Sequence, residues 1–134
     1  MNNTAMIKAA HAESQPSPDV DLVVEYIDSV WNQKRFAELS AYLHDDYVDH
    51  SMPHVSVQNK EGLLLYLGEM ARTVSHTTEI VGLTTLGELV ICHIRISVAA
   101  LSTQADTCRV TEVFYGYRTF RMCAGKIAEH WEII

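Results

Sequence analysis

The apolar pattern of this chain changes its period near residue 76, and that change limits the fold more than any other feature of the sequence. Before it, apolar residues recur every three or four positions, which is typical of amphipathic helices. After it, apolar and polar residues alternate, which is typical of strands that bury one face. The alternation predicts four antiparallel strands at 77–86, 88–101, 107–122 and 126–134. Helices followed by a run of strands indicate an α+β fold.

The first half of the chain supplies the helices. Residues 1–16 have no sustained period and are expected to form a flexible arm. Ser17 can cap a helix over about 18–33, a shorter helix follows, and Asn59 can cap a third helix over about 60–74. A short strand is expected around residues 47–51. We therefore expect a single domain over 17–134, in which three N-terminal helices pack on the concave face of a curved antiparallel or mixed sheet.

Charge and composition exclude several classes of partner. The net charge is −7 and the ten basic residues are scattered, which argues against a nucleic-acid partner. No apolar run is long enough to cross a membrane, and the N-terminus lacks the apolar segment of a secretory signal, so a cytoplasmic location is expected. A sheet covered by helices commonly encloses a pocket for a small molecule.

Three motifs carry a resemblance to a known family. They are Trp31-Asn32 before the second helix, Tyr47 with His50 on the first strand, and the run from Phe120-Arg121 to His130-Trp131. With the order of elements from Val20 to the end, they resemble the SnoaL-like polyketide cyclase family, which has the nuclear-transport-factor-2-like (cystatin-like) fold. The resemblance implies a cone-shaped, usually dimeric domain that performs acid–base catalysis without metal or cofactor. It also admits isomerases, dehydratases, epoxide hydrolases and non-catalytic binding domains.

One position departs from the cyclase pattern. The cyclases resemble one another in placing an acid–base aspartate two residues before the Phe of the Phe-Arg pair, and this chain has Arg118 there. The aldol-type mechanism therefore does not carry over unchanged. Arg118 shares an otherwise apolar strand face with Glu112, where a charge must be paired or must meet a ligand. Six residues of extended strand separate the two by about 20 Å, so each needs another partner.

The last strand is expected to pair with 107–122 and to close the edge of the sheet. Its register decides whether His130 or Trp131 faces the pocket. A two-residue turn before it places Trp131 opposite Arg118, whereas a turn bulged at Gly125 places His130 there. The Gly-Lys ending of the turn favours the bulge, with His130 inside and Trp131 against the rim or a partner subunit.

The run HDDYVDHSMPH contains the residue types of a metal site, yet its spacing argues against one. Asp46 and His50 on one straight strand lie about 13 Å apart, too far to share an ion. We therefore expect no metal. His50 is instead a candidate for proton transfer, and the alternative is a histidine satisfied at a strand end.

The expected function is a cofactor-independent enzyme for a small apolar metabolite, by cyclisation, isomerisation, dehydration or hydrolysis. His50 or His130 would move a proton, and Arg118 would stabilise an enolate or oxyanion. The expected pocket lining is Tyr47, His54, Tyr66, Met70, Glu112, Phe114, Phe120 and Trp131. The alternative function is a non-catalytic ligand-binding or dimerisation domain, which would not bring two titratable groups to one cavity. A homodimer is expected because Tyr115 and Tyr117 lie on the other face of their strand.

Overall fold

The computed structural model describes residues 17–101 and 111–134. The expected arm at 1–16 and the expected start of the third long strand at 107–110 lie outside the described residues. The elements are α2 (Pro18–Tyr26), η1 (Ile27–Asn32), η2 (Phe36–Glu38), α3 (Leu39–Tyr42), β1 (Leu43–Asp49), η3 (Val55–Val57), α4 (Lys60–Thr73), β2 (Val74–Leu86), β3 (Leu89–Ala100), β4 (Thr111–Cys123) and β5 (Lys126–Ile133). This is the α+β order that the change of period predicts.

The five strands form one open sheet in the order β1-β5-β4-β3-β2. The pairs from β2 to β5 are antiparallel, and β1 pairs with β5 in parallel. The last strand was expected to close the edge of the sheet, and this is wrong, because β5 lies between β4 and β1. Its second neighbour is therefore a strand from the first half of the chain.

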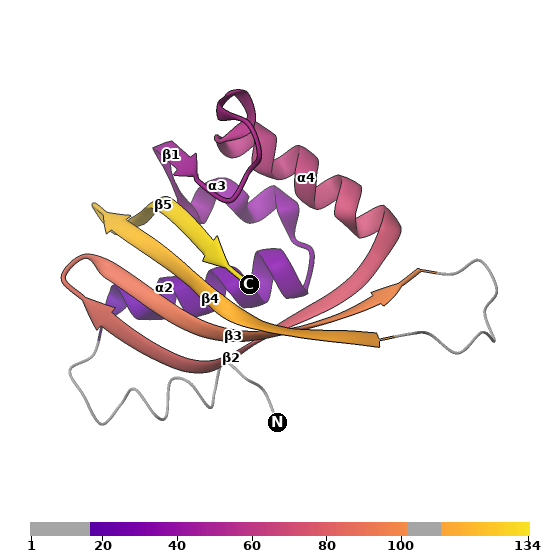
Figure 1. Cartoon of the computed structure of the whole chain (residues 1–134). Helices are drawn as coiled ribbons and strands as arrows, with labels where there is room; N and C mark the ends of the chain where they lie inside the picture. Colours follow the sequence, from indigo (N-terminus) through magenta and orange to yellow (C-terminus); the bar gives the residue numbers. More distant parts are fainter. Residues whose placement is uncertain (1–16, 102–110) are drawn as a thin grey trace.

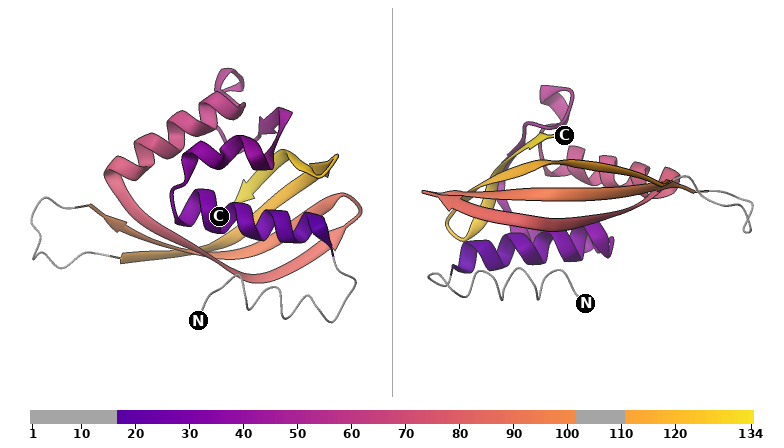
Figure 2. Two further views of the ribbon diagram at one scale, coloured as in Figure 1. Left: turned by 180° about the vertical axis from the view of Figure 1, so that it is seen from behind. Right: turned by 60° about the horizontal axis from the view of Figure 1, so that its bottom comes forward.

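The helices lie over one face of the sheet, as the view from behind in Figure 2 shows most clearly. In Figure 1 the long curved strands β2, β3 and β4 pass in front of α2. Ser17 caps α2 with its side-chain oxygen, and Asn59 caps α4 in the same way. The inner face of β3 is buried against this layer, with Val90, Cys92, Ile94 and Ile96 alternating inward. The core thus lies between the sheet and the helices.

The Trp31-Asn32 motif fixes the end of the first helix to β2. Here the helix widens into the π-turn η1, and Asn32 follows Trp31 at its end. The Asn32 side chain accepts a hydrogen bond of 2.8 Å from the Thr78 backbone nitrogen and donates one of 2.9 Å to the Thr78 carbonyl. The Asn32 side chain thus satisfies both backbone groups of Thr78, a buried residue of β2. These two bonds fix the end of the helix to the strand, and the neighbouring Trp31 is held against the inner face of the sheet.

The turn between β4 and β5 has two residues, and the bulge lies further along the strand. Ala124 and Gly125 both have positive φ, 52° and 77°, which matches a tight hairpin turn. Met122 pairs with Ile127 but Arg121 pairs with Glu129, so Ala128 is the extra residue. The bulge was expected at Gly125, and this position is wrong. The shift nevertheless turns His130 toward the core, as expected.

Candidate functional site

A cavity of about 350 Å³ opens between the helices and the inner face of the sheet. Its size suits a small molecule of one or two rings. The residues around it are Trp31, Ser51, Met52, Pro53, Tyr66, Met70, Val74, His76, Ile96, Val98, Phe114, Arg118, Glu132 and Ile134. Most of this lining is apolar, and the polar groups come from α4, β2, β4, β5 and the turn after β1.

Arg118 is the buried cation of this cavity. Its side chain is only 4% exposed, and its Nε donates a 2.8 Å hydrogen bond to Oε2 of Glu132. The guanidinium lies 3.9 Å over the ring of Trp31, a favourable cation–π contact. Glu132 stands opposite Arg118 in the β4–β5 register, where neither Trp131 nor His130 was found. Within the described residues, the buried Nη1 of Arg118 has no hydrogen-bond partner.

The parallel pairing of β1 with β5 brings Asp49 beside His130. The two residues are partners in the register, and the backbone nitrogen of His50 donates to the His130 carbonyl at 2.8 Å. The Asp49 Oδ1 and the His130 Nδ1 are 3.1 Å apart, and both side chains are almost fully buried. An imidazole next to a buried carboxylate is held in one orientation, with its other nitrogen left for chemistry.

Asp49 is held as a carboxylate by three neighbours. The Tyr47 hydroxyl donates to its Oδ2 at 2.6 Å, and the Ser51 backbone nitrogen and hydroxyl donate to its Oδ1. Burial alone would raise the pKa of Asp49, but the hydrogen bond and the positive charge of the His130 imidazolium, with the hydrogen bonds from Ser51 and Tyr47, outweigh it and lower the pKa to about 2. Asp49 therefore stays ionised at neutral pH.

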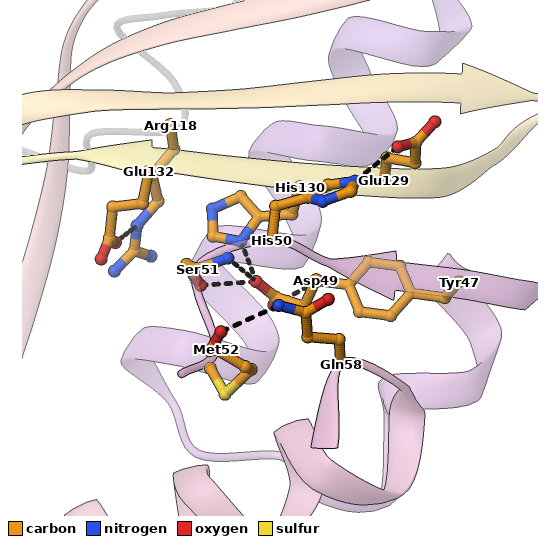
Figure 3. Close-up of polar contacts among 10 residues, drawn as sticks. All are labelled: Tyr47, Asp49, His50, Ser51, Met52, Gln58, Arg118, Glu129, His130 and Glu132. Carbon is orange, nitrogen blue, oxygen red and sulfur yellow. Dashed lines mark hydrogen bonds and ion pairs between the residues drawn. The ribbon is translucent and has the colours of Figure 1, made fainter. Parts of the chain in front are cut away.

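The His130 ring is packed so that only its outer edge is unused. It stacks on Phe120 with the ring centroids 5.0 Å apart. Its Nε2 is buried and has no hydrogen-bond partner in the described part of the chain. Figure 3 shows this edge of the ring turned to the side on which Arg118 and Glu132 lie. Ser51 and Glu132 line the cavity, so the Asp49–His130 pair lies directly behind the cavity wall.

His76 lines the cavity itself, unlike His130 and His50, and sequence reasoning missed it. Burial lowers its pKa, and the positive charges of Arg118 and Lys34 lower it further. Its ring meets Trp31 edge-on at 6.0 Å. The expected strand began one residue too late to include it. Counting the alternation back from Thr78 and Ile80, which are buried on the same strand, would have placed His76 on the inner face.

The profile of the SnoaL-like domain family matches residues 23–130, which is most of the chain and includes the Asp49–His130 pair. The protein belongs to the SnoaL-like family. Among curated proteins none matches this chain. The family assignment confirms the resemblance that the motifs carried.

Solved structures of similar fold cover most of this SnoaL-like chain. A SnoaL-like polyketide cyclase from Agrobacterium tumefaciens has a TM-score of 0.68 and 18% identity, over 88% of this chain and 91% of that one. A candidate polyketide cyclase from Acidithiobacillus ferrooxidans has a TM-score of 0.72 and 14% identity, over 90% and 89%. A LEH-like epoxide hydrolase from M. tuberculosis has a TM-score of 0.66 and 16% identity, over 86% and 80%. At these identities the similarity shows the fold.

His50 does not face the cavity of this SnoaL-like protein. Strand β1 ends at Asp49, and the chain turns there, so the alternation that predicted the direction of His50 does not apply. The His50 ring is exposed, lies 2.6 Å from Glu129, and stacks on Trp131 with centroids 4.8 Å apart. Figure 3 shows His50 directed toward Glu129 and away from Asp49. Trp131, expected to line the pocket, is likewise not among the residues around the cavity described above.

The other expected lining residues divide into three groups. Tyr66, Met70 and Phe114 line the cavity, whereas Tyr47 and Phe120 are buried behind it around Asp49 and His130. His54 and Glu112 are exposed and do not line it. His54 lies in the turn before η3. Glu112 lies near the start of β4, where side chains still alternate between the two faces of the strand but are exposed on both.

Asp49, Ser51 and Glu132 were not among the expected site residues. Asp49 lies on the run HDDYVDHSMPH, but three aspartates there are equivalent by sequence alone. Glu132 could have been found, because it is two residues from His130 on the same face of β5. No cluster of three metal-ligating side chains was found in residues 17–101 and 111–134. In the same residues, no helix is long and apolar enough to cross a membrane.

Replacement of Asp49 should remove part of the acid sensitivity of the fold. Its pKa is about 2 in the folded protein, against 3.8 for an aspartate free in water, so acidification protonates the unfolded chain first and favours unfolding. The resulting stabilisation, roughly 2 kcal/mol, is present above pH 4 and lost as the pH falls toward 2. In denaturant titrations from pH 5 to pH 2, the stability advantage of the wild type over Asp49→Asn should therefore shrink by this amount. The control is Asp46→Asn, altered at an exposed site of the same strand, and its free energy of unfolding should change with pH as that of the wild type does. A stability difference between the wild type and Asp49→Asn that stays constant with pH would contradict the assignment.

Proposed function

We propose that this SnoaL-like protein is a cofactor-independent acid–base enzyme for a small, mostly apolar metabolite. The observation that supports it is the buried Asp49–His130 pair, whose free ring nitrogen lies behind the wall of the cavity that contains Arg118. Such a pair has the geometry of a general base with an orienting carboxylate.

In the proposed reaction, Asp49 accepts the hydrogen bond from Nδ1 and leaves Nε2 of His130 as the proton acceptor. A substrate that reaches past Ser51 and Glu132 to this nitrogen loses a proton to His130 from a carbon next to its carbonyl group, and negative charge develops on the carbonyl oxygen. The unpartnered Nη1 of Arg118 stabilises that oxygen. Protonated His130 then returns the proton at another position. Cyclisation, isomerisation and dehydration can all begin with this step, and hydrolysis is the further alternative.

The convergence of titratable groups favours an enzyme over a purely binding domain. Arg118, Glu132 and His76 all reach one cavity, and the first two are in direct contact. The names of the structural neighbours, which include polyketide cyclases and an epoxide hydrolase, agree with this choice. Because Arg118 replaces the aspartate of the cyclases, the proposed base comes from β1 and β5 instead of β4.

The His130→Gln variant should lose proton-transfer activity. The assay is exchange of the α-protons of 2-tetralone, a two-ring ketone, in deuterated buffer by NMR. Loss of a general base should reduce the catalysed rate by about 100-fold or more. The control is His93→Gln on the outer face of β3, where the ring stacks on Tyr117, and this variant should keep the wild-type rate. Equal rates for His130→Gln and the wild type would contradict the role of His130.

We also propose that the protein is a homodimer that buries the outer face of β4. Val113, Tyr115 and Tyr117 are 49%, 57% and 48% exposed on this face, which makes an apolar patch that favours association. Light scattering should give twice the 15.1 kDa mass of one chain. The double change Tyr115→Glu and Tyr117→Glu should give monomers, while Val55→Glu, on an exposed turn, should not. A wild-type monomer at micromolar concentration would contradict the proposal.

A further inference from the structure

We infer that the substrate is a small carboxylic acid whose carboxylate binds the free edge of Arg118 and whose apolar body fills the cavity. The inference deepens the proposed function and rests on it, because it takes the same cavity as the substrate site. The proton-transfer proposal requires only that charge develops near Arg118 during the reaction. The geometry points to an anion that is already present on the substrate.

The guanidinium of Arg118 is fixed before any ligand binds. Glu132 holds the Nε edge at 2.8 Å, and the Trp31 ring covers one face at 3.9 Å. Figure 3 shows the two terminal nitrogens of Arg118 directed away from its strand, beyond the contact with Glu132. The group therefore presents one preorganised edge to the cavity instead of a mobile charge.

One nitrogen of that edge is not satisfied by the protein. Nη1 is buried without a hydrogen-bond partner among the described residues, and the arginine side chain is only 4% exposed. Buried polar groups in folded proteins are normally hydrogen-bonded, so an exception at a cavity indicates a missing partner. A planar carboxylate matches the terminal edge of a guanidinium with two parallel hydrogen bonds, whereas a neutral carbonyl has one oxygen to offer.

The charged side chains of the cavity lining are one arginine and its partner. The cavity lining contains one arginine and one acid, Glu132, which is 24% exposed and can be partly solvated. Burial is the main cause that lowers the pKa of His76, and the positive charge of Arg118 lowers it further, so this charge acts on other groups of the cavity. Because Glu132 occupies the Nε edge of Arg118, an added carboxylate would have to bind the terminal nitrogens on the side away from Glu132.

The rest of the cavity determines the body of the acid. Met52, Met70, Val74, Ile96, Val98 and Phe114 supply apolar walls that offer no further hydrogen bonds. With a volume of about 350 Å³, the site accommodates a single ring, two fused rings or a short branched chain. Arg118 therefore favours a carboxylate head, and the apolar walls favour an apolar body.

The test compares two probes of one shape, 2-naphthoate and its neutral amide 2-naphthamide, at pH 7.5. The chain has two tryptophans, and Trp131 lies outside the cavity, so a Trp131→Phe background leaves Trp31 as the reporter beneath Arg118. Quenching of Trp31 fluorescence gives both dissociation constants. We expect naphthoate to bind at least about tenfold more tightly than naphthamide, as a charge-assisted contact requires.

Three variants assign the preference to Arg118. Arg118→Met should abolish the difference between the probes, while Arg95→Met, which alters an arginine paired with Glu79 on the outer face, should leave it intact. Glu132→Gln keeps the arginine, removes the competing charge, and should tighten naphthoate binding alone. This variant decides the matter even where Arg118→Met fails to fold. Equal affinities for the two probes, no saturable binding of naphthoate, or unchanged naphthoate binding in Glu132→Gln would each overturn the inference.

The outcome is separable from that of the proton-transfer proposal. His130→Gln should bind naphthoate as the wild type does, because Arg118 and its contacts do not involve His130. If the wild type binds the two probes equally but catalyses proton exchange that depends on His130, then His130 is the base for a neutral substrate. If the wild type prefers naphthoate but the His130→Gln variant exchanges protons as fast as the wild type, then the cavity binds anions and another residue is the base.

Discussion

The parallel pairing of β1 with β5 is the constraint on which the proposed site depends. It joins the first strand of the chain to the last and places Asp49 directly beside His130. The carboxylate and the imidazole can then be buried together, because each satisfies a polar atom of the other and Tyr47 and Ser51 satisfy the rest of the carboxylate. Without this pairing, either side chain would be an unsatisfied polar group in the core.

A second set of contacts allows a buried arginine in the same cavity. Asn32 fixes the end of the first helix to β2, which places the Trp31 ring beneath the guanidinium of Arg118. Glu132, its partner in the β4–β5 register, completes the support. The Trp-Asn motif thus has a role in both the fold and the site. Asn32 fixes the helix to the sheet, and Trp31 lines the cavity beneath Arg118.

Local patterns predicted the strands, the helix caps and the inward direction of Arg118, because periodicity and capping depend on residues close in sequence. They did not predict the β1–β5 pairing or the bulge at Ala128, which depend on contacts between distant segments. His130 was expected to face inward, and it does, but through a different turn and a different bulge. His50 shows the opposite case: β1 ends at Asp49, two residues before the expected end at 51, and the expected cavity histidine turns toward Glu129.

The tautomer of His130 tests the central claim most directly. A ¹⁵N NMR spectrum of the histidine-labelled protein at pH 8.5, with His130→Gln to assign the resonances, reports which ring nitrogen carries the proton. The account predicts a proton on Nδ1, shared with the Asp49 carboxylate, and a bare Nε2 that can accept a proton from a substrate. A proton on Nε2 would contradict it, because Nδ1 could then only accept a hydrogen bond, and an ionised Asp49 has none to donate.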